Sequence, residues 1–112
     1  MAVIVYSTDP PALLQAIRAA IKDGKIQTWS VDSDGDFTHS PVQWRLKAWF
    51  RPKTADGKIV FLILTPQKQS MSKVTYAVYH GRFIEMLLNH FDTQFDRAIA
   101  SALPSDGDQI KG

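Results

Sequence analysis

Apolar residues recur at strand spacing in some parts of this chain and at helical spacing in others. Residues 2–6 are rich in β-branched side chains and predict a first strand. Thr8 and Asp9 stand before two prolines, and Pro fits the first helical positions because its missing N–H is not needed there. Apolar residues then follow at helical spacing up to Gly24. This pattern predicts a helix over residues 10–23.

The most apolar segment of the chain is residues 59–64, and it follows the pair Asp56-Gly57. Asp-Gly between two apolar runs predicts a hairpin with a two-residue type I′ turn, which needs positive φ at both turn residues. The turn sets the register of the hairpin, which pairs Ala55 with Lys58, Arg51 with Leu62, Phe50 with Ile63 and Trp49 with Leu64.

The two faces of this hairpin differ in chemistry, because side chains alternate along a strand. One face is an ordinary core face and carries Leu46, Ala48, Phe50, Ile59, Phe61 and Ile63. The other face mixes apolar and cationic side chains and carries Lys47, Trp49, Arg51, Lys53, Val60, Leu62 and Leu64. A strand that is apolar on both sides is usually covered on both sides. We therefore expect a helical layer or a partner molecule over Trp49, Leu62 and Leu64.

The same periodicities assign the rest of the chain. They predict a strand at residues 25–31, one turn of helix at 41–45, strands at 46–53 and from 58 to Thr65, a strand at 73–79, and a helix at 81–103. Ser40 and Gln43 form the capping pattern of the short turn. Alternation already begins at Val42, which leaves the start of the following strand open.

The resulting element order is β-α-β-β-β-β-α. Short links between successive strands favour an antiparallel sheet, and the two helices have apolar stripes that need a sheet face to cover them. The sequence therefore predicts an α+β fold with a sheet of four to five strands and two helices packed on it. Residues 1–104 are expected to form a single domain, and residues 105–112 a frayed polar tail.

Composition argues against several kinds of chemistry. The chain has no cysteine, so it offers no disulfide, no thiolate nucleophile and no cysteine-based zinc site. Neither of the glycine-rich phosphate-binding patterns occurs. The first residues lack the basic segment of a signal peptide, and no apolar run approaches the ~20 residues of a membrane span. We therefore expect a cytoplasmic protein without a membrane segment or a cofactor.

Charge is unevenly placed, although the formal net charge is only +2. Residues 42–82 hold eight Lys and Arg residues and a single acidic residue, Asp56. Such asymmetry indicates an anionic partner, although lysines on exposed strands also keep sheets from pairing with one another. Aromatic side chains among cations are typical of proteins that bind single-stranded nucleic acid. This combination is present at Arg45, Lys47, Trp49 and Arg51.

The acidic run Asp32-Ser33-Asp34-Gly35-Asp36 is the clearest candidate for a metal site. Carboxylates this close suit a hard cation such as Ca²⁺ or Mg²⁺, and His39 follows three residues later. Asp34, Asp36 and His39 could then form the site of a metal-dependent hydrolase. The alternative is a solvated loop in which Asp side chains bond the local backbone.

These patterns lead to three hypotheses about function. The first is a small, non-enzymatic interaction or regulatory domain that binds a second copy of itself or another protein. Its binding residues are Arg45, Lys47, Trp49, Arg51, Leu62 and Leu64. The second is a nucleic-acid-binding module on the basic strand around Trp49. The third is a metal-dependent enzyme that uses Asp34, Asp36 and His39.

Overall fold

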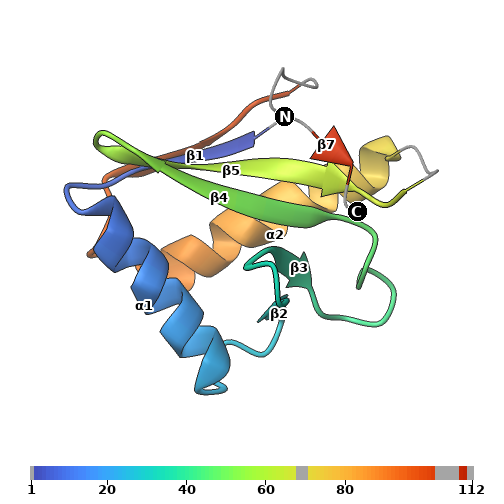
Figure 1. The fold of residues 1–112 in the computed structure, drawn as a ribbon, viewed down its shortest axis with the longest axis horizontal. Coiled ribbons are helices and arrows are strands. Elements are labelled where there is room, and N and C mark those ends of the chain that lie inside the picture. Colours follow the sequence, from blue (N-terminus) through green and yellow to red (C-terminus); the bar gives the residue numbers. More distant parts are fainter. Residues whose placement is uncertain (1, 68–70, 103–108, 111–112) are drawn as a thin grey trace.

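The computed structural model describes residues 2–67, 71–102 and 109–110. They form an α+β fold in which both helices lie on the same side of a sheet (Figure 1). In chain order the elements are β1 (Ala2–Tyr6), α1 (Pro10–Lys22), β2 (Trp29–Val31), β3 (Phe37–His39), β4 (Trp49–Ala55), β5 (Lys58–Thr65), α2 (Lys73–His90), β6 (Arg97–Ala100) and β7 (Gln109–Ile110). The predicted fold class is confirmed.

The sheet has more strands than the four to five predicted. Six antiparallel strands follow the order β2-β3-β4-β5-β1-β6, and β7 pairs in parallel with β5. Of the predicted frayed tail, residues 105–108 and 111–112 lie outside the described residues, while Gln109 and Ile110 form β7 beside Leu64 and Thr65.

The first helix forms as predicted. Asp9 is its N-cap, because its Oδ1 atom accepts a hydrogen bond of 3.2 Å from the Ala12 N–H. Leu13 and Ile17 lie one turn apart and are buried against the sheet. Gly24 follows the last turn with a φ of +78°, a conformation that glycine adopts without a steric penalty.

The hairpin of β4 and β5 has the predicted register in all four pairs, from Ala55 opposite Lys58 to Trp49 opposite Leu64. The predicted turn type is wrong. Gly57 has a φ of +72°, whereas Asp56 is not among the residues with positive φ. A type I′ turn needs positive φ at both positions, so only the second turn residue here depends on glycine.

The predicted strand at 46–53 begins later, at Trp49. Residues 41–47 form a loop instead, and its Arg45 N–H bonds the Pro41 carbonyl at 2.9 Å, as in the helical turn predicted there. The loop ends with Leu46 in a left-handed conformation, at a φ of +60°. A residue in the left-handed conformation does not continue a β-strand, so the strand predicted from the alternation of apolar and polar residues begins only after Leu46.

The short strand β3 was not predicted, and β2 is shorter than the predicted strand at 25–31. The acidic loop connects β2 to β3 as a tight hairpin, in which Asp32 N–H bonds the Asp36 carbonyl at 2.9 Å. Together β2 and β3 lie on the helix side of β4 (Figure 1). Only one residue pair, Phe37 with Phe50, joins β3 to β4 in register.

The last third of the chain contradicts two predictions. Residues 73–79 form the first part of a helix rather than a strand, and the helix ends at His90 rather than at 103. Ser72 caps this helix, α2, because its Oγ atom accepts a hydrogen bond of 3.1 Å from the Thr75 N–H. The region predicted as the end of the helix contains β6, which pairs with β1.

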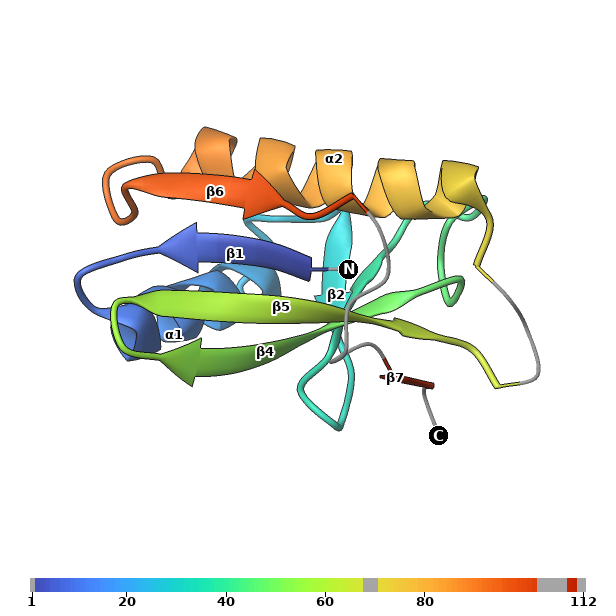
Figure 2. The same ribbon diagram turned by 90° about the horizontal axis from the view of Figure 1, so that it is seen from above.

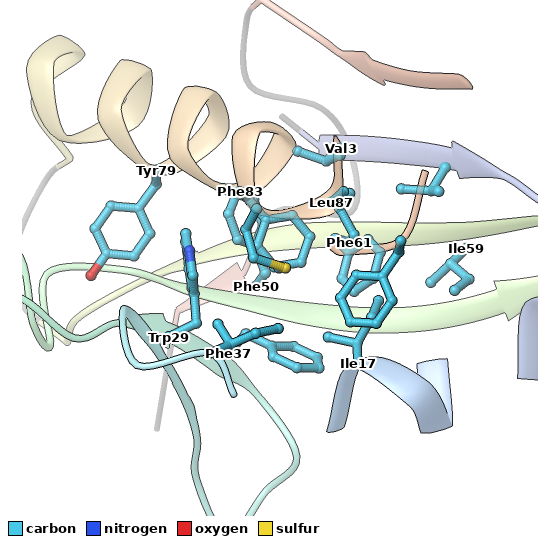
Figure 3. Close-up of a cluster of buried hydrophobic side chains, with 14 of the residues drawn as sticks. Val3, Ile17, Trp29, Phe37, Phe50, Ile59, Phe61, Tyr79, Phe83 and Leu87 are labelled. Carbon is cyan, nitrogen blue, oxygen red and sulfur yellow. The ribbon is translucent and has the colours of Figure 1, made fainter. Parts of the chain in front are cut away.

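The core lies between the sheet and the helices and is largely aromatic (Figure 3). Phe83 of α2 occupies its centre, with ring centroids 4.7 Å from Phe61, 4.8 Å from Phe50 and 4.9 Å from Trp29. All four side chains are buried. Packed aromatic rings close this side of the sheet, so a functional site would lie at the surface.

Candidate functional site

The structure separates the six predicted binding residues into different environments. Arg45 and Lys47 are exposed on the loop before β4 rather than on a strand. Trp49 and Leu64 are buried, and Leu64 has no exposed surface at all. Leu62 is half-buried. These residues therefore do not form one exposed surface, and Arg51 has a structural contact described below.

The face of the sheet opposite the helices, here called the outer face, contains Leu62 and a set of residues from four strands. Antiparallel partners stand directly opposite one another, so the register places their side chains in rows. One row contains Lys53, Val60, Ile4 and Ile99. A second row contains Arg51, Leu62 and Ala2. A third row contains Ala55, Lys58, Tyr6 and Arg97.

The outer face is apolar in the middle and cationic at its borders. Ile4, Val60 and Leu62 are half-buried, and Ile99 is 44% exposed. Lys53 lies at one border. At another, the guanidinium carbon of Arg97 lies 4.1 Å from the centre of the Tyr6 ring, and its Nη1 atom is paired with the Asp96 carboxylate at 2.7 Å. Within the described residues, both helices lie on the opposite side of the sheet (Figure 1).

Arg51 is held by an acidic residue of the β2–β3 loop. Its Nε and Nη2 atoms donate hydrogen bonds of 2.9 and 2.8 Å to the two carboxylate oxygens of Asp36. The Asp36 side chain has no exposed surface, while that of Arg51 is 41% exposed. Bonding to Asp36 raises the pKa of Arg51. A bidentate pair of this kind positions two segments of backbone.

The carboxylates of Asp32, Asp34 and Asp36 approach one another, with one oxygen of each within 4.8 Å of the others. Asp32 Oδ1 also accepts hydrogen bonds of 3.0 Å from the backbone N–H groups of Asp34 and Asp36. This is the local backbone bonding that stabilises an acidic turn without a cation. These backbone hydrogen bonds, together with the bonds from Arg51 to Asp36, therefore account for the arrangement of the three carboxylates.

His39 does not join this carboxylate cluster. Its ring lies 4.7 Å from the ring of Trp29, and its Nδ1 atom lies 2.8 Å from the Thr28 carbonyl oxygen. Phe37, two residues earlier on the same short strand, also points into the aromatic core, whereas Asp36 bonds Arg51. Alternation along the strand thus separates His39 from the acidic residues.

A small cavity of about 200 Å³ lies beside His39. It is lined by Thr28, His39, Pro41, Gln43, Trp44, Arg82 and Glu85. Burial lowers the pKa of His39, the Thr28 carbonyl acts against this, and Arg82 lowers it further. A neutral ring that donates from Nδ1 to Thr28 keeps Nε2 as a hydrogen-bond acceptor. The cavity could accept a small polar molecule, but its two charged residues, Arg82 and Glu85, are paired with each other at 2.9 Å.

Two residues of the outer face, Ile4 and Ile99, were missed by the sequence patterns. Ile4 was assigned to a strand, but nothing in the sequence indicated that β1 pairs with β5. Ile99 was assigned to the stripe of a helix, since Phe95, Ala98 and Ile99 continue helical spacing. The outer face therefore emerges only when β1 and β6 are placed beside the hairpin.

Neither helix of the described part of the chain combines the length and the apolar composition needed to cross a membrane. No protein-family model matches this chain, and neither a curated protein nor a solved structure matches it.

Proposed function

We propose that this protein is a protein-interaction module whose outer face docks an acidic protein partner. The observation that carries the proposal is the row of Lys53, Val60, Ile4 and Ile99, which has cationic and apolar side chains side by side on the face opposite the two described helices. An apolar centre supplies the driving force of docking, and charges at the rim supply steering and specificity.

The charges favour an acidic partner over a second copy docked face to face. A second copy on the outer face would bring Lys53 and Lys58 of the two copies into the same interface, and like charges facing each other disfavour an interface. A partner with aliphatic residues flanked by Asp and Glu would match both the centre and the borders of the face.

Burial of Trp49 favours a protein over single-stranded nucleic acid. Nucleic-acid binders of that kind stack bases on exposed aromatic rings. Trp49 is 9% exposed, and Arg51 is committed to Asp36. The centre of the outer face is instead aliphatic, which suits the side chains of a protein partner.

Titration with a synthetic peptide tests this proposal. The probe is an amphipathic helical peptide with leucines on one face and glutamates beside them, and a scrambled peptide of the same composition is the control. We expect saturable amide chemical-shift changes at Ile4, Val60, Leu62 and Ile99, and weaker binding as salt increases. Shift changes that map to the helix side of the molecule would overturn the proposal.

Two double variants with the same change in charge sharpen the test. Lys53→Glu with Lys58→Glu reverses the charge at the borders of the outer face, and we expect peptide affinity to fall by about ten-fold or more. Lys22→Glu with Lys25→Glu, at the end of α1, should change it by less than about two-fold. Equal losses in the two variants, or tighter binding of a single-stranded oligothymidylate at the outer face, would contradict the proposal.

A further inference from the structure

The cavity of about 200 Å³ beside His39, here called the His39 cavity, is separate from the outer face. Its walls come from Thr28, from β3, from the loop of residues 41–47 and from α2. Figure 2 shows the segment between β3 and β4, in green, passing beside the first half of α2, in yellow. No residue of the three rows on the outer face lines this cavity. A ligand of the His39 cavity would therefore not compete for the outer face.

The Thr28 carbonyl sets the orientation and the tautomer of the His39 ring. It accepts a hydrogen bond of 2.7 Å from the Ser40 N–H and lies 2.8 Å from Nδ1 of His39. A carbonyl oxygen can only accept, so Nδ1 carries a proton. Burial lowers the pKa of His39, which favours the neutral ring. In that ring, Nε2 is a hydrogen-bond acceptor.

The Nε2 atom of His39 is an acceptor that the protein leaves unused. Among the described residues, no group donates a hydrogen bond to it. The residue is only 5% exposed. Unlike the indole nitrogen of Trp29, however, Nε2 is not sealed by protein atoms, and the His39 ring lines the cavity. A buried acceptor without a partner costs free energy, which a ligand with a donor would recover.

Arg82 supplies hydrogen-bond donors at the exposed end of the His39 cavity. Both of its bonds to Glu85, of 3.2 and 2.9 Å, come from the single nitrogen Nη1. A guanidinium group has five N–H donors on three nitrogens. Among the described residues, Nε and Nη2 of Arg82 have no bonding partner, so the pair with Glu85 leaves donors for a ligand.

The wall between these two ends is held in place, and the volume limits what fits. The Trp44 carbonyl accepts a hydrogen bond from the Tyr79 hydroxyl, and the Trp44 N–H bonds the Pro41 carbonyl at 2.8 Å. The Trp44 side chain is half-buried and packs on the core. A cavity of about 150 Å³ accommodates benzene. The His39 cavity therefore has room for one ring with small substituents.

We propose that the His39 cavity binds a small, neutral ring compound with a hydroxyl or N–H donor at one end and a carbonyl acceptor at the other. The donor bonds His39 Nε2 at the buried end, and the ring lies against Trp44. The carbonyl accepts from Arg82 at the exposed end. A neutral compound fits better than an anion, because Glu85 places a negative charge beside Arg82. This binding site is independent of the proposed function.

Titration of the full chain with two related probes tests the inference. 4-Hydroxybenzamide carries a hydroxyl opposite an amide carbonyl, and benzamide lacks only the hydroxyl. Compounds of this size bind with dissociation constants of about a millimolar. We expect saturable amide chemical-shift changes at Thr28 and Gln43, and none at Ile4 or Val60. 4-Hydroxybenzamide should bind about five-fold more tightly than benzamide, which corresponds to one hydrogen bond.

A second pair of probes distinguishes the two kinds of donor. Uracil carries ring N–H groups beside its carbonyls, and methyl groups replace both N–H groups in 1,3-dimethyluracil. The pair that shows the larger preference for its donor-bearing member identifies the donor as a hydroxyl or an N–H. Equal affinities within both pairs would overturn the inference, and so would the absence of saturable binding by both donor-bearing probes.

Two variants assign the contacts to individual residues. His39→Phe keeps a ring but removes the acceptor, so each donor-bearing probe should bind no more tightly than its control. Arg82→Met changes an exposed residue and should weaken both benzamides by about five-fold, since both carry the carbonyl. Lys22→Met, which removes the same charge at the end of α1, should change either affinity by less than about two-fold.

The variants also give the results that would contradict the inference. A preference for the donor-bearing probes that persists in folded His39→Phe would show that Nε2 does not bind them. Unchanged affinities in Arg82→Met would exclude the second contact, and this test does not depend on the buried ring. Binding of the acidic peptide to the outer face should be the same in His39→Phe as in the wild type, so the two proposals can fail separately.

Discussion

Arg51 of β4 donates two parallel hydrogen bonds, of 2.9 and 2.8 Å, to the fully buried carboxylate of Asp36. The pair lies next to Phe37 and Phe50, which form the single register pair between β3 and β4. It therefore takes the place of a longer backbone ladder in holding the β2–β3 hairpin to the sheet. A residue predicted to bind a partner has a structural role here.

Replacement of Arg51 by Met should destabilise the protein by about 2–3 kcal/mol. Removing one partner of a buried pair costs several kcal/mol, and the partial exposure of Arg51 reduces that cost. Urea unfolding measures the change. Arg82→Met is the matched control, because Arg82 and Glu85 are both exposed, and its effect should stay within about 0.5 kcal/mol. Equal losses would show that burial of Asp36 does not matter.

The free energy of unfolding should decrease as the pH falls and His39 becomes protonated. Burial lowers the pKa of His39 in the folded state, so the unfolded chain, with a pKa of about 6.5, binds the proton more readily. The stabilising contribution is therefore complete above about pH 6.5 and declines as the pH falls toward the folded-state value. His39→Asn should flatten this decline in unfolding experiments between pH 7 and 5.

The control for His39 is Gln43→Ala, which changes the wall of the same cavity without removing a titrating group. It should retain the slope of the wild type. The ring protons of His39, followed by NMR, should titrate with a midpoint below about 6.5. A midpoint above that value would contradict burial as the dominant influence on this residue.

Tyr79→Phe should loosen the loop of residues 41–47. The Tyr79 hydroxyl donates to the Trp44 carbonyl and lies 3.1 Å from Oγ1 of Thr38, which in turn bonds the Ala48 carbonyl at 2.9 Å. We expect a loss of about 1–2 kcal/mol and faster amide hydrogen exchange at Leu46. Tyr6→Phe, at a half-buried residue, should cost less than about 0.5 kcal/mol. Unchanged exchange in Tyr79→Phe would contradict this role.

Gly57→Ala should cost about 1–2 kcal/mol, because the residue has a φ of +72° that a side chain disfavours. The surrounding space is open, so the cost comes from the backbone alone. Asp56→Ala should stay within about 0.5 kcal/mol, since Asp56 does not have positive φ. Thermal unfolding of the two variants measures both effects. A comparable loss in Asp56→Ala would contradict this prediction, because it would indicate that Asp56 also has positive φ, as in a type I′ turn.

Local signals were sufficient for α1 and for the β4–β5 hairpin. Asp9 and the two prolines mark the beginning of α1, and Gly24 marks its end. The two-residue turn at Asp56 and Gly57 sets every pair of the hairpin, so its register follows from residues that are close in sequence. Val60 and Leu62 were assigned to the correct face for the same reason.

The assignment of residues 73–79 failed because two periodicities overlap there. Val74, Tyr76 and Val78 alternate as in a strand, but Thr75, Tyr79 and Phe83 also recur every four residues as in a helix. Burial of the second set against the sheet favours the helix. The predicted element order matches the first seven observed elements only because the unpredicted β3 replaces the predicted strand at 73–79.

Some elements of this fold are thus specified by short-range contacts, and others by long-range contacts. Caps, turn residues and alternation specify α1, the central hairpin and the α+β class, because each depends on neighbours a few residues apart. The strand β6, the position of β1 and the outer face depend on contacts between residues nearly one hundred positions apart, such as Ala2 with Ser101. Four residues reading Arg-Ala-Ile-Ala have no strong preference of their own, and the open edge of β1 makes them a strand.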